Sequence, residues 1–157
     1  MLNSKDSVKN LVTKEGLESL KSEYKLKLKE RDRIEIEINL ARAEGDLKEN
    51  EAYHAGLLAR DINENRISEI ESILENYTLV KVKQNDLVQI GSTVTVKVDN
   101  EEKIYKIVGV NESDPMEGKI SGDSPVGSAL LGKKVGDSVS FSVDNSSFKY
   151  DIIKVVN

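Results

Sequence analysis

Two carboxylates, Asp46 and Glu49, stand three residues apart in the segment GDLKEN, residues 45–50. Carboxylate oxygens suit Mg²⁺, a hard ion that usually keeps several waters when one or two carboxylates bind it. Two carboxylates alone make a weak metal site, so a partner would have to supply further ligands. The spacing also has a structural explanation, because Asp46 as N-cap and Glu49 three residues later form a capping box that opens a helix. From spacing alone, the capping interpretation accounts for both acids without any function.

The stretches on both sides of this segment have the residue spacing of helices. We expect Thr13 to be the N-cap of the first helix and Gly45 to be the residue that ends it. Apolar residues follow alternating steps of three and four, with Lys27 and Arg31 at intermediate positions. The first apolar face comprises Leu17, Leu20, Tyr24, Ile34, Ile38 and Ala41, and the second comprises Tyr53, Leu57, Leu58, Ile62, Ile67, Ile70, Leu74 and Tyr77.

These two helices are expected to form an antiparallel coiled-coil hairpin. A reversal at residues 47–48 pairs Ile38 with Leu57 and Leu58, leaving apolar contacts near both ends and a polar, weakly specified centre. A first helix from residue 14 to residue 44, at roughly 1.5 Å per residue, makes an arm about 46 Å long. So long and thin an element is either a dimerisation element or a probe.

The second half of the chain alternates apolar and polar residues with a period of two, as in strands. In the segment from Ser124 to Gly132, serine is a predicted N-cap, Pro125 the first helical residue and the last glycine a stop. We therefore predict an α+β protein with an N-terminal helical arm, residues 1–77, and a compact antiparallel β domain with a short helix, residues 78–157. The expected strands are Thr93–Val98, Lys103–Val110, Ser138–Val143 and Phe148–Val155, with a turn at residues 144–146.

Composition excludes several classes of function. The sequence has no cysteine and one histidine, so a disulfide framework and a histidine-built zinc site are not expected. The net charge of −5 argues against direct binding of free nucleic acid through its phosphates. No apolar run approaches the roughly 18 residues of a membrane span. The polar start, MLNSKDSVKN, lacks the apolar centre of an export signal, so we expect a cytoplasmic protein.

Two segments, ARAEGDLKENEAYHAG at the bend and SPVGSALLGKKVGD in the second domain, resemble the Gre family of bacterial transcript cleavage factors. The resemblance extends from about residue 13 to residue 155, with both motifs in the expected order. It implies that the second domain is FKBP-like and docks at the entrance of the secondary channel of RNA polymerase. The arm would then reach the backtracked 3′ end of the nascent RNA. Such a factor is not itself an enzyme, because it completes the active site of the polymerase.

The resemblance also assigns roles to residues at the bend. Asp46 and Glu49 match the acidic pair, which implies that they help hold Mg²⁺ and orient the attacking water, but only inside the polymerase. Arg42 matches a basic position that meets the extruded RNA. Asn50 and Tyr53 match tip positions, which implies tip positioning or polymerase contact. Ordinary helix hydrogen bonding for Asn50 and seam packing for Tyr53 remain open as alternatives.

In the second domain, Ser124 and Pro125 match the loop and helix that dock on polymerase, although local helix capping explains them equally well. Leu57 stands where an arginine of the family is expected, so the basic patch is thin. Within the family, the thin basic patch favours the GreA branch over the GreB branch.

Three other functions stay open. A channel-binding inhibitor of the same architecture would occupy the polymerase without promoting cleavage. A peptidyl-prolyl isomerase would need an aromatic pocket, and residues 78–157 offer only Tyr105, Phe141, Phe148 and Tyr150. A coiled-coil dimerisation module would make the charged tip incidental, whereas we expect a monomer that meets polymerase and RNA.

Overall fold

The structure is a computed structural model that describes residues 10–157. Most of the polar N-terminal stretch, on which the expectation about export rests, therefore lies outside the described residues. The described chain divides into two compact units. One unit is the helical arm, Leu17–Asn76, and the other, the sheet unit, combines residues 10–16 with Tyr77–Asn157. The sequence-based division had placed residues 10–16 with the arm.

Residues 10–16 belong to the sheet unit because a short parallel strand pair joins them to the chain that follows the arm. Strand β1 (Leu11–Val12) pairs with β2 (Thr78–Leu79), so the two segments flanking the arm lie side by side. Neither two-residue strand was predicted, because its alternation is too short to be recognised in sequence.

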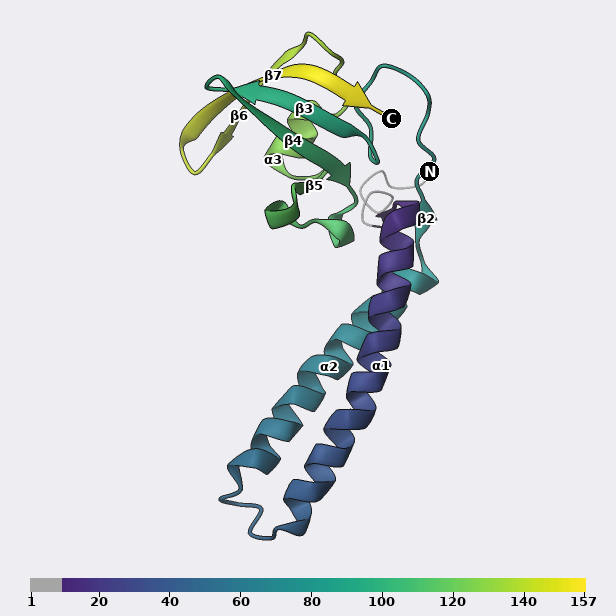
Figure 1. Ribbon diagram of the computed structural model, residues 1–157, viewed down its shortest axis with the longest axis vertical. Helices are drawn as coiled ribbons and strands as arrows, with labels where there is room; N and C mark the ends of the chain where they lie inside the picture. Colours follow the sequence, from purple (N-terminus) through teal and green to yellow (C-terminus); the bar gives the residue numbers. More distant parts are fainter. Residues whose placement is uncertain (1–9) are drawn as a thin grey trace, which may run out of the picture. The chain divides into compact units, whose positions relative to one another are not determined.

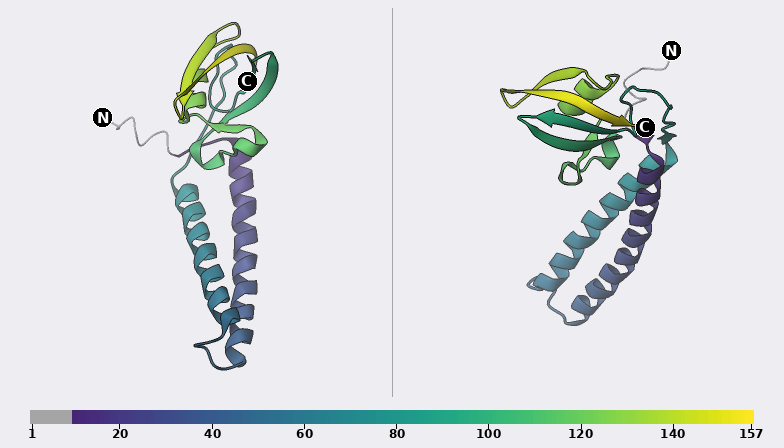
Figure 2. Two further views of the ribbon diagram at one scale, coloured as in Figure 1. Left: turned by 90° about the vertical axis from the view of Figure 1, so that its left-hand side faces the viewer. Right: turned by 45° about the horizontal axis from the view of Figure 1, so that its top comes forward.

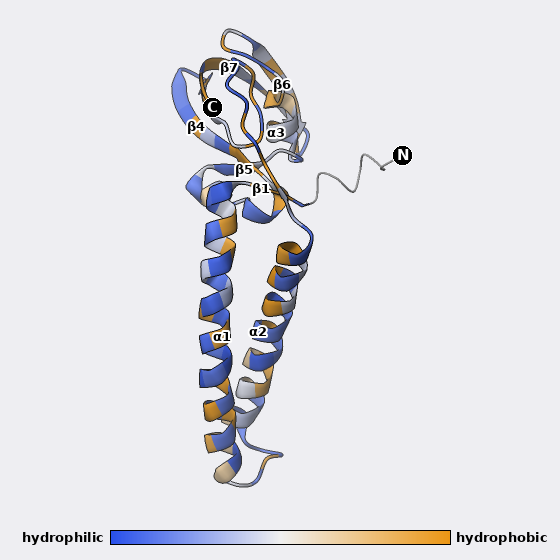
Figure 3. Cartoon of the chain, turned by 90° about the vertical axis from the view of Figure 1, so that its right-hand side faces the viewer, coloured by the Kyte–Doolittle hydropathy of each residue, from blue (hydrophilic) through white to orange (hydrophobic). Residues whose placement is uncertain are grey.

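The arm consists of two antiparallel helices, α1 (Lys14–Ala43) and α2 (Glu51–Glu75), which run side by side in all three views (Figures 1 and 2). The 30 residues of α1 correspond to a length of about 45 Å. Thr13 caps α1 as predicted, since its Oγ1 accepts a hydrogen bond of 3.0 Å from the Gly16 N–H. The predicted hairpin is therefore present. Figure 3 shows hydrophilic residues dominating both helices, with hydrophobic bands between them.

The apolar seam of the arm differs from the prediction on α2. Leu58 and Ile62 are each 61% exposed, and Tyr77 is also exposed. Gly56 faces Ile38 instead, because a Cβ atom added at Gly56 would lie only 2.7 Å from Ile38 Cγ1. The reversal was thus predicted within one residue, but α2 is rotated so that a glycine meets the first helix. The buried apolar residues of the arm are Leu17, Leu20, Ile34, Ile38 and Ala41 of α1, and Ile67, Ile70 and Ile73 of α2.

The centre of the seam is polar, as predicted, but it is specified by directional contacts. Arg31 donates two hydrogen bonds of 2.6 Å to both oxygens of Glu64. Arg66 donates to both oxygens of Glu23, at 2.6 and 2.8 Å. Asn63, only 3% exposed, donates its amide hydrogen to the carbonyl oxygen of residue 27 at 3.0 Å. A planar arginine that contacts both oxygens of a carboxylate is attracted to it by charge, and it also restricts the relative orientation of the two side chains. The expectation of a weakly specified centre was therefore wrong.

These ion pairs predict that the arm loses stability in acid. Hydrogen bonds from Arg66 and Arg31 lower the pKa of Glu23 and of Glu64 below the usual 4.5. A lowered pKa in the folded state adds stability above the unfolded pKa, and this stability is lost as pH falls through the folded pKa. We expect the free energy of unfolding to be nearly constant from pH 7 to about 5 and to fall below about 4.5. Urea titrations followed by helical circular dichroism at several pH values measure this.

The matched variant for this prediction is Glu23→Gln. The Arg66–Glu23 pair is about one-third exposed on both sides, so after screening by solvent we assign it about 0.5–1 kcal/mol at pH 7. Glu23→Gln should lose that amount at pH 7 and almost nothing further from this pair at pH 3. An equal acid loss in Glu23→Gln and wild type would show that the pair contributes no pH dependence.

The larger sheet of the sheet unit has five strands in the order β5-β4-β3-β7-β6, with α3 packed against one face (Figure 1). Within this five-stranded sheet, all pairings are antiparallel except that of β4 with β5, which is parallel. The α+β class is confirmed, and the sheet is mixed where an antiparallel one was predicted. Its elements are β3 (Thr93–Val98), β4 (Glu101–Val108), η1 (Val110–Glu112), η2 (Pro115–Glu117), β5 (Lys119–Ser121), α3 (Pro125–Leu130), β6 (Ser138–Val143) and β7 (Ser146–Val156).

The core of the sheet unit lies between α3 and one face of the sheet, and it is mostly aliphatic. Buried residues that pack together are Val88, Val94, Val96, Ile107, Leu130, Val139, Tyr150 and Ile152.

Two left-handed turns, at residues 99–100 and 144–145, close the β3–β4 and β6–β7 hairpins. The second of these turns confirms the predicted turn at residues 144–146. Among the described residues, no helix is long and apolar enough to cross a membrane.

Candidate functional site at the tip of the arm

Residues 44–50 connect α1 to α2 and form the tip of the arm. Gly45 has φ +81° and Asp46 has φ +37°, so two successive residues take the left-handed conformation. Glycine adopts this conformation freely, and aspartate is among the few other residues that tolerate it. The Glu49 N–H then donates to the Asp46 carbonyl oxygen at 3.2 Å. The two acidic residues therefore occupy the two ends of a single tight turn.

The predicted capping box is absent. Helix α2 begins at Glu51, and its N-cap is Asn50, whose Oδ1 accepts a hydrogen bond of 3.0 Å from the Tyr53 N–H. Asp46 lies too early to cap α2, because residues 46–49 form a turn of their own. Both acidic side chains are exposed, and within residues 10–157 neither makes a hydrogen bond or an ion pair. Their carboxylate oxygens are thus free to accept from another molecule.

The other predicted tip residues contact one another. The Asn50 Nδ2 donates to the Ala41 carbonyl oxygen at 2.8 Å, linking the start of α2 to the last turn of α1. The Arg42 guanidinium carbon lies 5.9 Å from the centre of the Tyr53 ring, within range of a cation–π contact. The Tyr53 ring also meets His54 edge to face at 5.7 Å. The structure therefore brings Arg42, Asn50 and Tyr53 together beside the acidic turn.

The sequence-based argument did not anticipate that Asn50 would be the N-cap. The signal was present, since asparagine is among the preferred N-cap residues. The Asp-x-x-Glu spacing directed attention to residue 46 instead. His54, interpreted as a seam or surface residue, is exposed, and its Nε2 lies 3.4 Å from the Lys48 carbonyl oxygen.

The tip offers part of a metal site. Two exposed carboxylates free of other contacts are chemically suited to Mg²⁺. Among residues 10–157, no group of three or more histidine, cysteine, aspartate or glutamate side chains could hold a metal ion. Asp46 and Glu49 thus fit the ion as donors but do not complete its coordination. Any ion held here needs ligands from a second molecule.

Ser124 and Pro125 lie at the start of α3 in the sheet unit. The Ser124 Oγ accepts a hydrogen bond of 3.0 Å from the Gly127 N–H and donates one of 2.7 Å to the Ser121 carbonyl oxygen. Its hydroxyl therefore has an internal structural role. Pro125 occupies the first helical position, where no N–H is needed, and it is exposed. Of the two predicted docking residues, Pro125 presents the more accessible side chain.

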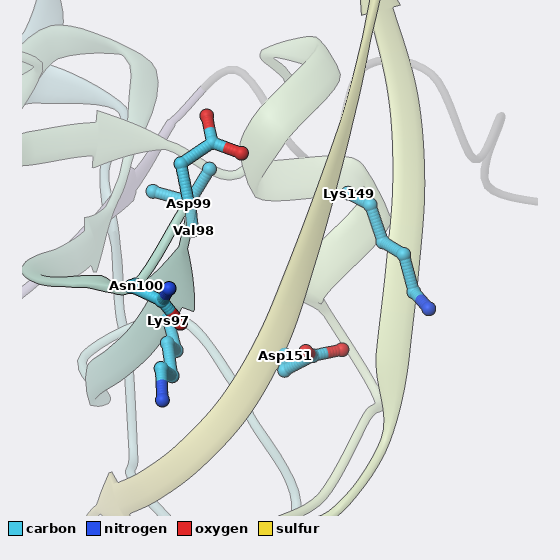
Figure 4. A pocket seen from close by; sticks show the side chains of 6 residues that line it. All are labelled: Lys97, Val98, Asp99, Asn100, Lys149 and Asp151. Atoms are coloured by element: carbon cyan, nitrogen blue, oxygen red, sulfur yellow. The ribbon is translucent and has the colours of Figure 1, made fainter.

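The sheet unit also has a surface hollow of about 270 Å³ near the β3–β4 turn, shown in Figure 4. Its lining mixes positive, negative and neutral residues: Lys97, Val98, Asp99, Asn100, Lys149 and Asp151. It has no aromatic wall of the kind that a prolyl-isomerase pocket would need. Four rings instead pack in series: between ring centres, Tyr150 lies 6.0 Å from Tyr105 and 4.8 Å from Phe141, and Phe141 lies 5.7 Å from Phe148. Burial raises the pKa of Tyr150 to about 12.

Comparison with known protein families covers almost the whole described chain. Residues 10–79 match the family described as "Transcription elongation factor, N-terminal". Residues 83–157 match "Transcription elongation factor, GreA/GreB, C-term". The chain belongs to the GreA/GreB family. It is thus a Gre-family transcription elongation factor, and the predicted resemblance is confirmed.

Two relatives that are named GreA support the GreA branch. The chain is 42% identical over 148 residues to transcription elongation factor GreA of Thermomicrobium roseum, covering 92% of this chain and 95% of that protein. It is 42% identical over 153 residues to GreA of Legionella pneumophila (strain Lens), covering 94% and 96%. Among solved structures, GreA factor homolog 1 of Thermus thermophilus is 22% identical, with a TM-score of 0.45 over 94% of this chain and 98% of that chain.

Proposed function

We propose that this Gre-family factor inserts the tip of its arm into the secondary channel of bacterial RNA polymerase. There it stimulates cleavage of nascent RNA whose 3′ end has backtracked. The observation that carries the proposal is the state of Asp46 and Glu49. Both are exposed at the end of a helical arm, in a defined turn, and neither side chain has a partner among residues 10–157. Carboxylates that serve only to stabilise the fold would be expected to pair or to cap.

In the proposed complex, Asp46 and Glu49 would contribute oxygen ligands to a Mg²⁺ ion whose remaining ligands come from polymerase. The ion would supply charge stabilisation to the attacking and leaving oxygens of the RNA phosphodiester. We assign Asp46 mainly to ion ligation. Glu49 is assigned to the ion or to the attacking water, which it would orient by accepting a hydrogen bond. The isolated protein is not an enzyme in this proposal, because the polymerase supplies the rest of the site.

The other contacts proposed with RNA and polymerase are based on which side chains are exposed and on their charge. Arg42 is exposed beside the acidic turn, so its guanidinium can meet a phosphate of the extruded RNA. Pro125 would contact the polymerase surface, with the Ser124 cap holding the start of α3 in place. The seam of α1 is already covered by α2 of the same chain, which favours a monomer over a coiled-coil dimer. The site of action would be the cytoplasm, where bacterial polymerase works.

The deciding experiment uses backtracked elongation complexes assembled with cognate polymerase, Mg²⁺ and RNA labelled at the 5′ end. Adding the full-length protein should shorten the labelled RNA about 10²-fold faster than polymerase alone, because preorganised charge at an active site typically contributes that much. Added nucleotides should then extend the shortened RNA. Binding to polymerase without any faster cleavage would overturn the proposal and would instead indicate a channel-binding inhibitor of the same architecture.

A further inference from the structure

We propose that Asn50 is a positioning residue for the acidic pair, acting through a single amide that ties together the two helix ends at the tip. This inference rests on the proposed function for its activity measurements, and it has a separate structural test on the free protein. Of the two roles that the resemblance implies for Asn50, tip positioning and polymerase contact, it selects tip positioning.

Both halves of the Asn50 amide are occupied. Its Oδ1 accepts from the Tyr53 N–H at 3.0 Å, which satisfies one of the free N–H groups at the start of α2. Its Nδ2 donates at 2.8 Å to the Ala41 carbonyl oxygen in the last turn of α1, which also accepts a hydrogen bond of 3.2 Å from the Glu44 N–H. The turn that carries Asp46 and Glu49 lies between these two anchor points. One side chain therefore closes the base of the loop on both sides.

The residue type is informative. Serine, threonine and aspartate cap helix N-termini about as well as asparagine does. None of these three side chains carries an N–H donor beside its acceptor on one planar group, whereas asparagine does. Capping alone therefore does not require asparagine at position 50. The additional bond to Ala41, across the hairpin, is made by a second atom, Nδ2, which only asparagine among these four residues carries.

A neighbouring contact reinforces the same connection. Tyr53, whose N–H bonds to Asn50, lies one turn into α2, and its ring faces the Arg42 guanidinium of α1 at 5.9 Å. The amide and the ring–cation contact thus link the same two helical turns. Between them, Gly45 and Asp46 hold left-handed conformations that a free loop would leave readily. Without the amide, we expect the acidic pair to sample several orientations.

The test separates the two hydrogen bonds by substitution. Asn50→Ser keeps a capping acceptor but lacks Nδ2, the separate atom that reaches Ala41, and Asn50→Ala loses both bonds. In Asn50→Asp the cap is kept, but an oxygen faces the carbonyl. We expect each variant to lower the maximal cleavage rate at saturating factor by about 10-fold or more, because small misplacements of reacting groups cost that much. The factor concentration for half-maximal cleavage should stay within about twofold.

The structural readout uses the free, full-length protein. NMR order parameters of the Asp46 and Glu49 amides should fall in Asn50→Ser from the value of an ordered turn toward that of a flexible loop, below about 0.6. Far-UV circular dichroism should show that the helices of the Asn50→Ser variant are intact. In wild type, both amides should have order parameters close to those of the adjoining helices.

Two results would overturn the inference. A raised half-maximal concentration with unchanged order parameters would show that Asn50 contacts polymerase directly. Unchanged rates and unchanged order parameters would show that the bond to Ala41 contributes nothing. If wild type fails to stimulate cleavage, the proposed function fails, yet the order parameters of Asn50→Ser still decide whether the amide orders the turn.

Discussion

Changing the acidic pair to its amides, Asp46→Asn with Glu49→Gln, should reduce stimulated RNA cleavage by about 10²-fold or more while leaving affinity for polymerase within about twofold. The substitutions remove two negative charges and weaken both side chains as Mg²⁺ ligands, but they keep size and hydrogen-bonding acceptors. Neither carboxylate has a partner among the described residues, so removing the charges breaks no internal contact. Cleavage of backtracked complexes and competition binding to polymerase measure the two quantities.

Amides are better probes than alanine at this turn because of the backbone conformation of Asp46. Its φ of +37° lies in the left-handed region. An ordinary side chain there costs roughly 1–2 kcal/mol, whereas asparagine tolerates the region. Asp46→Ala would therefore change the turn as well as the charge. With Asp46→Asn, a loss of cleavage is attributable to the missing carboxylate.

The matched control is Glu51→Gln, which removes another exposed charge, from the first turn of α2. Its cleavage rate should stay within about twofold of wild type. An equal loss in Glu51→Gln and in Glu49→Gln would show that overall tip charge matters and that residue 49 has no special role.

The two single variants test the separate roles assigned to Asp46 and Glu49. Asp46→Asn should raise the Mg²⁺ concentration needed for cleavage, and Glu49→Gln should lower the maximal rate at saturating Mg²⁺ if it orients water.

The sequence directed attention to the acidic pair, but the local structure predicted for it was wrong. Asp46 and Glu49 have the spacing of a capping box, and a capping box would have engaged both carboxylates. Spacing cannot show whether a helix starts at residue 47 or at residue 51. The left-handed Asp46 and the cap at Asn50 move the helix start, and that shift leaves both acids free. Whether they bind Mg²⁺ remains a prediction.

The packing of the arm could also be predicted only in part from the sequence. Length, antiparallel pairing and the polar centre all follow from the heptad pattern. The rotation of α2 about its axis does not follow from this pattern, because Leu57, Leu58 and Ile62 form a different apolar face that the prediction turned toward α1. Packing selects Gly56 for the close approach to Ile38, and a residue without a side chain carries no hydropathy signal. The central contacts, such as Arg31 with Glu64, join residues distant in sequence and need the register before they can be recognised.

In the sheet unit, the sequence predicted long hairpin strands and missed short parallel ones. Strands β3 and β6 have the predicted bounds because alternation over six residues is a clear signal. The predicted second strand extended to Val110, but β4 ends at Val108 and Val110 opens a 3₁₀ helix. The three-residue strand β5 is parallel to β4 and depends on a long connection that no local pattern encodes.

Gly127→Ala should destabilise the sheet unit by more than about 3 kcal/mol, although the position is helical. Alanine in a helix interior is usually about 1 kcal/mol more favourable than glycine. Here a Cβ atom would lie 2.0 Å from the Ser121 carbonyl oxygen and 2.9 Å from the Gly122 Cα. Both are backbone atoms, so no side-chain rotation can relieve the overlap. The connection between β5 and α3 would have to move, and with it the Gly127 N–H that Ser124 caps.

Gly132→Ala separates steric overlap from backbone strain. Gly132 has φ +74°, and a Cβ atom there would meet nothing within 4 Å, so we expect Gly132→Ala to lower the free energy of unfolding by only about 1 kcal/mol.

Thermal unfolding followed separately by near-UV signals of the sheet-unit tyrosines and by helical signals of the arm measures both variants. The arm of Gly127→Ala should keep its helical signal, because its seam lies in the other compact unit. A neutral or stabilising Gly127→Ala would mean that the close approach to Ser121 does not exist in solution. If Gly127→Ala instead unfolds the sheet unit and also abolishes polymerase binding, that unit is required for docking.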